Sequence, residues 1–168
     1  MMSFSAFSRI PSLLFEEGGD TMFYTWRATD RATTVSLHRF VQTLVANGSL
    51  PSPSLLPPDI HMSIIRSEND LPNYVPDKQT IRVKPLQWRL LGGNPNYYLA
   101  IITTPHDRIK KQLEIAKKMK AELVFPNFLP HISVAQFKTR HVEFEHLPLP
   151  KFDIVLEAEE RHEFNKFM

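Results

Sequence analysis

The spacing of apolar residues predicts a strand, a helix and a second strand in the first half of the chain. Residues 21–28 are rich in aromatic and β-branched side chains, which is the composition of a strand. From about residue 31 to 47, apolar side chains recur every three or four positions, and Asn47–Gly48 is a typical helix end. A proline-rich loop then leads into an apolar strand that begins at about residue 61.

The second half repeats this order of elements. Residues 96–103 predict a strand, and a helix follows to about Glu122, with Thr104 as its N-cap and Pro105 as its first residue. Another loop marked by prolines leads into a further apolar strand at about residue 131. The repeated order indicates an internal duplication whose two copies have diverged.

This repeat predicts an α+β fold of two pseudo-symmetric lobes, in which antiparallel sheets and flanking helices surround a central cleft. We expect a single domain over residues 1–168, with an N-terminal segment at 1–19 and lobes at approximately 20–92 and 93–168. Additional strands over residues 80–91 and 152–157 would complete the sheets.

The composition is that of a chain able to bury a core and to bind a small anion. With 168 residues, of which 42% are hydrophobic, the chain is long enough for one compact domain. The formal net charge is only +2, although residues 108–120 carry six lysines and arginines. This modest excess favours a small anionic ligand over long nucleic acid, and we expect the lysines to form a solvated helix face.

Several classes of protein are excluded or disfavoured. The absence of cysteine excludes disulfides, thiol nucleophiles and thiolate metal sites. No apolar run approaches the roughly 20 residues that a membrane span needs. Residues 1–15 lack the basic start and long apolar stretch of a signal peptide, so we expect a cytoplasmic protein without membrane contact. No spacing of carboxylates and histidines requires a metal, and we expect neither metal nor cofactor.

The strongest indication of function is a His-x-Ser motif that occurs once in each half. It appears as His61-x-Ser63 and, 70 positions later, as His131-x-Ser133, each time among apolar or β-branched residues. On a strand, residues i and i+2 point to the same face, so each motif places an imidazole beside a hydroxyl. Two imidazoles, of which one accepts a proton and the other donates one, suffice for metal-free cleavage of a phosphodiester.

With one such motif in each half of an α+β chain of this length, the sequence resembles the 2H phosphoesterase superfamily. The resemblance covers nearly the whole chain in the order of its elements, whereas close identity is confined to the two motifs. It implies the 2H phosphoesterase-like fold and a catalytic role for four residues, which are His61, Ser63, His131 and Ser133.

Further features are similar to the anti-CBASS phosphodiesterases of tailed bacteriophages, which degrade the cyclic oligonucleotide messengers of bacterial immunity. These features are Glu16–Glu17–Gly18–Gly19 before the first strand, Tyr74–Val75–Pro76, Trp88, and the acidic segment 157–160. Both motifs carry Ser where this subgroup is expected to carry Thr, and the hydroxyl group is kept.

The resemblance implies that the substrate is a cyclic di- or oligonucleotide with a 3′–5′ phosphodiester next to a free 2′-hydroxyl. One histidine would remove the 2′-hydroxyl proton and the other would protonate the departing 5′ oxygen, and the sequence leaves open which does which. Ser63 and Ser133 would hydrogen-bond the non-bridging oxygens, where charge develops.

The residues that hold the bases follow from position in the family pattern. Trp88 is the first candidate to stack on a base, and Tyr24 and Trp26 are weaker ones. Glu159 would accept hydrogen bonds from a base edge or a ribose hydroxyl. The remaining histidines have no paired context and are expected at the surface; they are His38, His106, His141, His146 and His162.

Two other functions compete with this interpretation. The first is an enzyme of the same superfamily that opens 2′,3′-cyclic phosphates at RNA ends or trims RNA, with the same catalytic residues and a different ligand-holding shell. The second is a non-catalytic module that captures a cyclic nucleotide as a sponge or sensor. The paired motifs disfavour the second, because binding alone does not require a matched acid and base.

Overall fold

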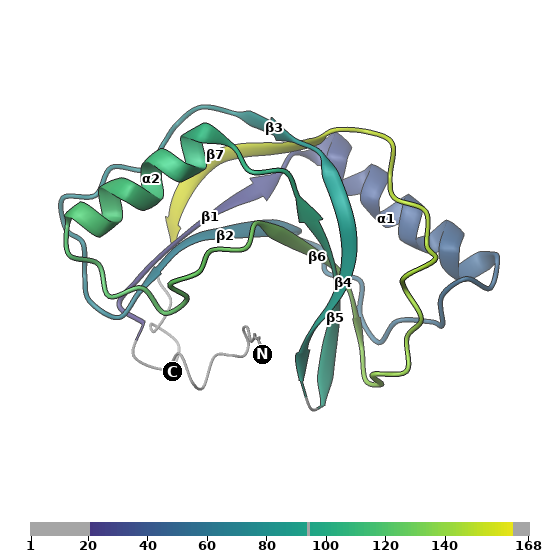
Figure 1. Cartoon of the computed structure of the whole chain (residues 1–168). Helices are drawn as coiled ribbons and strands as arrows, with labels where there is room; N and C mark the ends of the chain where they lie inside the picture. Colours follow the sequence, from purple (N-terminus) through teal and green to yellow (C-terminus); the bar gives the residue numbers. More distant parts are fainter. Residues whose placement is uncertain (1–20, 94, 163–168) are drawn as a thin grey trace.

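The computed structural model describes residues 21–93 and 95–162, which form seven strands and two helices (Figure 1). In chain order the elements are β1 (Phe23–Thr29), α1 (Arg31–Ala46), β2 (His61–Ser67), β3 (Ile81–Val83), β4 (Pro85–Gly93), β5 (Asn96–Thr103), α2 (Asp107–Lys118), β6 (His131–Phe137) and β7 (Ile154–His162). The segment Glu16–Glu17–Gly18–Gly19, which contributed to the family resemblance, lies outside the described residues.

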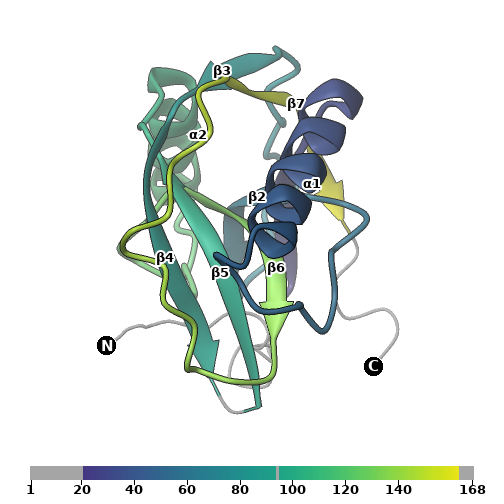
Figure 2. The ribbon, with the colours of Figure 1, turned by 90° about the vertical axis from the view of Figure 1, so that its right-hand side faces the viewer.

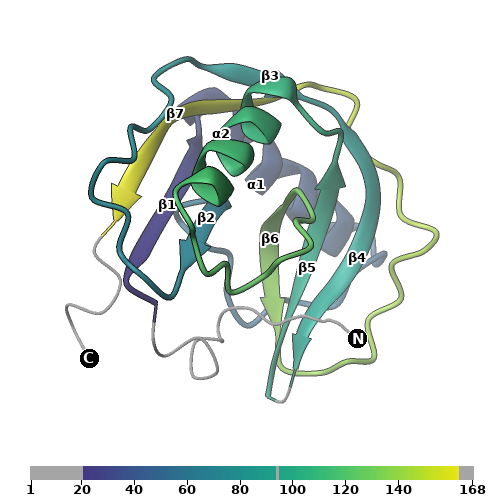
Figure 3. The same ribbon diagram turned by 60° about the vertical axis from the view of Figure 1, so that its left-hand side comes forward.

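The strands form two antiparallel sheets, so the predicted α+β class with flanking helices is confirmed. One sheet has the order β2-β1-β7-β3 and the other has the order β4-β5-β6. The edge strands β2 and β6, which carry the two His-x-Ser motifs, lie beside each other where the sheets meet (Figures 1 and 3). The two motifs are therefore neighbours in space although they are 70 residues apart in sequence.

The two helices lie on opposite sides of the molecule, and each packs against the motif strand of the other half. Helix α1 packs against β6, whereas α2 packs against β2 (Figure 2). Helix α1 begins where the apolar period predicts, with the Asp30 carboxylate accepting a hydrogen bond from the Thr33 N–H at 2.8 Å. Its buried side is formed by Thr33, Leu37, Val41 and Leu44.

The start of α2 differs from the prediction that Thr104 is the cap. The Thr104 hydroxyl accepts from the Lys84 N–H at 2.9 Å and its own N–H donates to the Lys84 carbonyl at 2.9 Å, so Thr104 extends the strand pairing. The helix starts at Asp107 instead, and Nδ1 of His106 accepts from the Arg108 N–H at 3.1 Å. A side chain tied into a sheet cannot also cap a helix.

The sheets do not follow the expected division of the chain at residues 20–92 and 93–168. The predicted strand over 80–91 is two strands, because the chain passes from one sheet to the other at Lys84. Strand β4 therefore joins the sheet of the second half, and β7 returns to pair with β1 in the sheet of the first half. Each half thus needs one strand from the other to complete its sheet.

The duplication is visible in the strand register. Across β1 and β2, Thr25 pairs with Ile65 and Trp26 pairs with Ser63, so Ile64 is an extra residue in β2. Across β5 and β6, Leu99 pairs with Ala135 and Ala100 pairs with Ser133, so that Val134 is the extra residue. Each motif strand therefore has a β-bulge directly after its serine, and bulges of this kind redirect side chains near functional sites.

The segments before the two motifs also exchange partners. Leu55, which precedes β2, pairs with Gln136 of β6, and Leu123, which precedes β6, pairs with Ser67 of β2. The Gln136 N–H donates to the Leu55 carbonyl at 2.9 Å, and the Val124 N–H donates to the Arg66 carbonyl at 2.9 Å. These reciprocal bridges fasten the two halves to each other on both sides of the motif strands.

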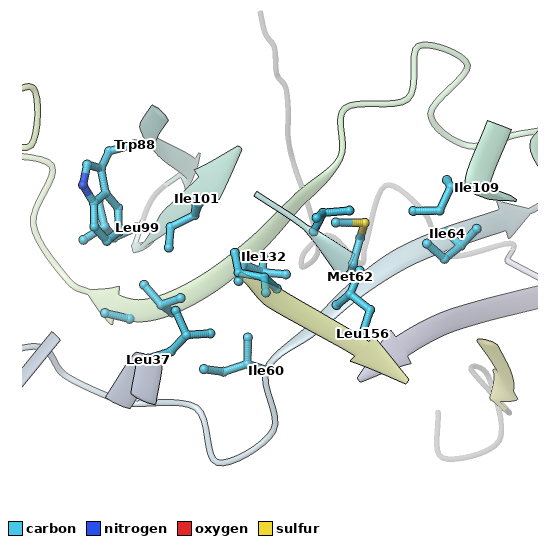
Figure 4. Close-up of a cluster of buried hydrophobic side chains, with 14 of the residues drawn as sticks. Leu37, Ile60, Met62, Ile64, Trp88, Leu99, Ile101, Ile109, Ile132 and Leu156 are labelled. Atoms are coloured by element: carbon cyan, nitrogen blue, oxygen red, sulfur yellow. The ribbon is translucent and has the colours of Figure 1, made fainter. Parts of the chain in front are cut away.

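The hydrophobic core explains the orientation of the motifs. Met62 and Ile132, the middle residues of the two motifs, are 0% exposed and lie in the buried cluster of Figure 4. Because successive side chains of a strand alternate between faces, their burial turns the flanking histidines and serines to the opposite face.

Candidate active site

The four motif residues lie on the face of the sheets that is opposite the core. Ser63 is exposed, and His61, His131 and Ser133 are partly exposed. Their strands β2 and β6 lie beside each other, and the charge of protonated His131 lowers the pKa of His61. The structure thus brings together the four residues that the sequence predicted to act together.

The ring of His131 is fixed by its own backbone. Nδ1 lies 2.8 Å from the carbonyl oxygen of Leu129, and because a carbonyl only accepts, Nδ1 carries the hydrogen. Burial lowers the pKa of His131, the hydrogen bond to Leu129 opposes this effect, and the charge of Arg89 lowers the pKa further. Nε2 is left to accept a proton from a ligand, or to donate one when the ring is charged.

The ring of His61 is held by stacking. The Trp26 ring centroid lies 3.8 Å from that of His61 and 3.8 Å from that of His162, so the indole contacts both imidazoles, with the ring planes tilted by 32° and 47°. Burial is the main cause that lowers the pKa of His61 to about 4; the Asp59 backbone opposes it, and the charges of His162 and His131 add to it. Nδ1 of His61 is buried and has no complete hydrogen bond within the described residues.

Ser63 has a tyrosine partner. The Tyr24 hydroxyl lies 2.8 Å from Oγ of Ser63, and burial raises the pKa of Tyr24, so the phenol keeps its proton. When Tyr24 donates to Oγ, the only hydrogen of the serine hydroxyl is free to point at a ligand. Tyr24, which the sequence predicted as a weaker candidate to stack on a nucleobase, therefore lies at the site. Its hydroxyl contacts the motif residue Ser63.

Trp88, predicted as the first base-stacking residue, is part of the core. Its side chain is 7% exposed, its Nε1 donates to the Pro148 carbonyl at 3.0 Å, and it stacks on Phe40 at 6.3 Å between centroids. It lies on the opposite face of β4 from Arg89, because neighbouring side chains of a strand alternate. The prediction that it contacts a substrate is wrong for this reason.

Glu159, predicted to accept from a ligand, is also buried, at 4% exposure. Its carboxylate accepts hydrogen bonds from the hydroxyls of Thr25 and Tyr74, both at 2.6 Å, from the Asp77 N–H at 2.9 Å and from Gln112 at 3.0 Å. It thereby fastens α2 and the loop before β3 to the back of the first sheet. The ligand contact predicted for it is wrong, because its oxygens are already occupied.

A β-bulge in β7 explains why Glu159, in the acidic segment 157–160, does not face the motifs as predicted. Arg27 pairs with Glu159 and Thr29 pairs with Leu156, so β7 contains one residue more than β1 in this stretch. The bulge puts Glu159 on the buried face and leaves Glu160 on the face of the motifs, opposite Trp26. Position along the sequence does not reveal such a shift.

The sequence interpretation missed two residues beside the motifs: His162, which contacts Trp26, and Arg89, whose charge lowers the pKa of His131. His162 was expected at the surface, yet it stacks on Trp26 and its Nε2 lies 3.6 Å from the Glu160 carboxylate. Burial lowers the pKa of His162, and Glu160 opposes this shift. Strand alternation from Glu160 to His162 was the available signal, but the predicted strand ended at residue 157.

The other histidines lie away from the motifs. His38 bonds the Pro57 carbonyl at 2.7 Å, His106 caps α2, and His141 and His146 are exposed. Within residues 21–93 and 95–162, no group of three His, Asp or Glu side chains is placed to hold a metal ion. No helix in the same part of the chain has the length and apolar character needed to cross a membrane.

No protein-family model matches the sequence, and no curated protein matches it. The fold is similar to that of Usb1 from Kluyveromyces marxianus with uridine monophosphate, with a TM-score of 0.48, 11% identity, and 74% of each chain covered. A second structure of the same Usb1 gives a TM-score of 0.45 and 13% identity, covering 71% of this chain and 72% of that one. Likenesses of this degree assign neither a family nor an activity to this chain.

Proposed function

We propose that this protein is a metal-independent phosphodiesterase of the 2H type, which uses His61 and His131 as an acid–base pair on ribonucleotide phosphodiesters. The observation that carries the proposal is the meeting of two His-x-Ser strands, β2 and β6, with both motifs on one face. Each imidazole has a hydroxyl two residues further along its strand, and the charge of His131 lowers the pKa of His61. Two imidazoles on one ligand face, of which one accepts a proton and the other donates one, are the equipment of general acid–base catalysis.

The proposed reaction begins at the 2′-hydroxyl next to the scissile phosphate. The base removes the hydroxyl proton as O2′ forms a bond to phosphorus, and the bond between phosphorus and the 5′ oxygen breaks. The acid gives its proton to that 5′ oxygen, so a 2′,3′-cyclic phosphate and a free 5′-hydroxyl are the products. Water can then open the cyclic phosphate with the same two groups, and each proton transfer contributes on the order of a hundred- to ten-thousandfold.

The surroundings of the two rings support His61 as the base and His131 as the acid. The Leu129 carbonyl accepts from Nδ1 of His131 at 2.8 Å, which stabilises the charged ring of the acid. Within the described residues, Nδ1 of His61 makes no complete hydrogen bond; the Asp59 backbone raises the pKa of this ring, but burial outweighs it and lowers the pKa to about 4, and the charge of His162 lowers it further. In the singly protonated pair, the proton therefore belongs on His131.

The serines would bind the non-bridging phosphate oxygens. Tyr24 orients Ser63 by a hydrogen bond of 2.8 Å, so the hydroxyl is aimed before the substrate arrives. A donor that is already in place stabilises the charge that develops on the phosphoryl oxygens without reorganisation. Ser133 occupies the equivalent position in the second half.

We favour an RNA end as the substrate, with a terminal 2′,3′-cyclic phosphate as the first ligand to test. The four motif residues require only a phosphodiester and the adjacent ribose oxygens, which every RNA end supplies. Trp88 and Glu159, on which the recognition of a cyclic messenger depended, are buried away from the motifs. A cyclic oligonucleotide, and with it the evasion of CBASS immunity by a phage, is the second candidate, because Tyr24 and Trp26 do lie at the site.

The test is incubation of the purified protein with three ligands in excess EDTA, followed by chromatography of the products. The ligands are an RNA oligonucleotide ending in a 2′,3′-cyclic phosphate, the same RNA with a free 3′ end, and 3′,3′-cyclic GMP-AMP. We expect EDTA-resistant turnover of the first that His61→Ala and His131→Ala each reduce by at least about a hundredfold. A matched control is His146→Ala, an exposed histidine away from the motifs.

Each outcome has a definite meaning. Turnover of cyclic GMP-AMP but not of the RNA end would replace the favoured substrate with the second candidate. Binding of any of the three without change, in the wild type as in the alanine variants, would overturn catalysis in favour of a sponge. Loss of turnover in EDTA that added metal restores would overturn the metal-independent mechanism.

A further inference from the structure

The outer strands of the two halves place opposite charges at equivalent positions. In the sheet that carries the first motif, Glu160 of β7 lies opposite Trp26 of β1, and Trp26 lies opposite Ser63 of β2. Side chains that are directly opposite across neighbouring strands share a face, so Glu160 is on the face of the first motif. Its side chain is 56% exposed.

In the sheet that carries the second motif, the equivalent position on the outer strand is occupied by a cationic side chain, Arg89. Arg89 of β4 lies opposite Ala100 of β5, which lies opposite Ser133 of β6. With strands roughly 4.8 Å apart, the Arg89 backbone is about 10 Å from that of Ser133, within the reach of a long side chain to a ligand held there. Ala100 between them is small, so no bulky side chain separates the guanidinium from the motif.

Among the exposed arginines that make no ion pair in the part of the chain that the structure describes, which are Arg31, Arg39, Arg89 and Arg140, Arg89 is the one that lies in the strand row of Ser133. Arg27, Arg82, Arg108 and Arg161 each contact a carboxylate. Arg89 is exposed and makes no ion pair within residues 21–93 and 95–162. A planar, permanently charged donor without a partner, on the same face as the motifs, suits a phosphate.

We propose that Arg89 binds a second phosphate of the substrate, the 3′-phosphate of the leaving nucleotide; this inference rests on the proposed phosphodiesterase function and gives the site a direction. Arg89 lies on the side of His131, which we assign as the acid that protonates the departing 5′ oxygen. The nucleotide that carries this oxygen therefore extends over the second sheet, and its own 3′-phosphate is the next anion along the chain.

Glu160 enforces the same direction from the other half. A carboxylate at the position equivalent to Arg89 repels a phosphate, so an additional phosphate on the first half is disfavoured. The site thus combines a repeated catalytic motif with an unrepeated pair of charges. For the first, cyclising step, the substrate class that fits is an oligonucleotide in which the leaving nucleotide carries a further 3′-phosphate or phosphodiester, whether linear or closed into a ring; a terminal 2′,3′-cyclic phosphate enters only the second step, in which no nucleotide departs.

The test is binding of short deoxynucleotides, which lack the 2′-hydroxyl and cannot be cleaved by the proposed reaction. The probes are the dinucleotide dTpdT, its 3′-phosphorylated form dTpdTp and its 5′-phosphorylated form pdTpdT. We expect the 3′-phosphate to tighten binding by roughly 3- to 10-fold and the 5′-phosphate to give no gain. Arg89→Gln should remove the 3′ gain and lower the salt slope of log K by about 0.7, whereas Arg89→Lys should keep most of both.

Glu160→Gln is the matched control at the equivalent position. It should leave the gain from the 3′-phosphate unchanged and weaken the discrimination against the 5′-phosphate. A 3′ gain that persists in Arg89→Gln, or no 3′ gain in the wild type, would overturn the proposal, and a 5′ gain that depends on Arg89 would reverse the direction. Because these probes measure binding alone, a failed cleavage assay with an Arg89-dependent 3′ gain would remove the proposed function and not the phosphate site.

Discussion

In the second half of the molecule, the motif imidazole of His131 is held by a hydrogen bond from Nδ1 to the Leu129 carbonyl. In the first half, Nδ1 of His61 makes no complete hydrogen bond within the described residues, although the Asp59 backbone raises its pKa, and the ring lies 3.8 Å from that of Trp26 between centroids. A hydrogen bond to a carbonyl favours a charged ring, whereas burial against an indole favours a neutral one. The comparison teaches that two equivalent motif positions hold their rings in different ways, which is the difference that the proposed roles of acid and base require.

The residues at equivalent register positions show where the halves diverged. Trp26 lies opposite Ser63, whereas the residue opposite Ser133 is Ala100. The first sheet therefore has an indole at the position where the second sheet has a methyl group. The Trp26 ring contacts both His61 and His162, and burial is the main cause that lowers the pKa of His61.

The largest effect should come from removing each histidine in turn and changing the leaving group. On RNA, His61→Ala and His131→Ala should each lose on the order of a hundred- to ten-thousandfold in kcat. On uridine 3′-(4-nitrophenyl phosphate), whose leaving group departs without a proton, His131→Ala should regain most of its activity and His61→Ala should not. Initial rates by absorbance measure this, and equal recovery of both variants would contradict the assignment of roles.

A smaller effect should follow from removing the ring that holds His61. In Trp26→Leu, water reaches the imidazole, and the pKa of His61 should rise from about 4 toward its usual value of 6.5, because burial is the main cause of the shift. A base must be neutral, so activity at pH 5 should fall more than activity at pH 7.5. NMR titration of the histidine ring protons and the pH–rate profile measure this.

The matched control for that experiment is Trp88→Phe, which alters a core indole on the other face of the second sheet. It should lower the free energy of unfolding and leave the titration of His61 unchanged. An unchanged titration in Trp26→Leu would show that stacking does not set the charge of His61.

A smaller decrease in kcat is expected when the Tyr24 hydroxyl, which contacts Ser63, is removed. Tyr24→Phe removes the bond of 2.8 Å to Oγ and should lower kcat by roughly 2- to 10-fold, which corresponds to a single hydrogen bond. In a Ser63→Ala background the same change should have no effect, because the partner is already gone. A double-mutant cycle in kcat measures this, and additive losses would show that Tyr24 acts independently of Ser63.

The smallest expected effect is on stability. The pKa of His61, His131 and His162 is lowered in the folded protein, so the unfolded chain binds more protons below its ordinary pKa of about 6.5. Stability from these groups is complete above that value and is lost as the pH falls, over a range that extends to about 4 for His61. Urea unfolding at pH 7.5, 5.5 and 4.5 measures this, and His61→Phe should flatten the dependence; an unflattened curve would assign it to other groups.

The sequence predicted the parts of the site that depend on strand alternation alone. His61 and Ser63, like His131 and Ser133, are two residues apart, and their buried neighbours Met62 and Ile132 settle the face. The bounds of helix α1 were also predicted from the sequence, because the apolar period and the end at Asn47 agree with the observed helix.

The parts that failed depend on distant contacts. Glu159 is buried because an extra residue in β7 shifts the alternation, and a bulge of this kind is set by pairing with β1. Trp88 and Trp26 are both aromatic residues on strands, and only the sheet arrangement decides which one faces the motifs. Thr104 lost its predicted role to His106 because Lys84, 20 residues away in sequence, binds both its hydroxyl and its backbone.

The reciprocal bridges between Leu55 and Gln136 and between Ser67 and Leu123 have a consequence for how the molecule reaches its native state. Each motif strand has its neighbouring edge covered by a segment from the opposite half, and both closures span more than 50 residues of chain. Such pairings form late and slow folding, because the entropy of closing a long loop is lost before the contacts are gained. Neither histidine can therefore reach its working position in a partly folded chain, and ligand-binding competence should appear only with the final, global folding step.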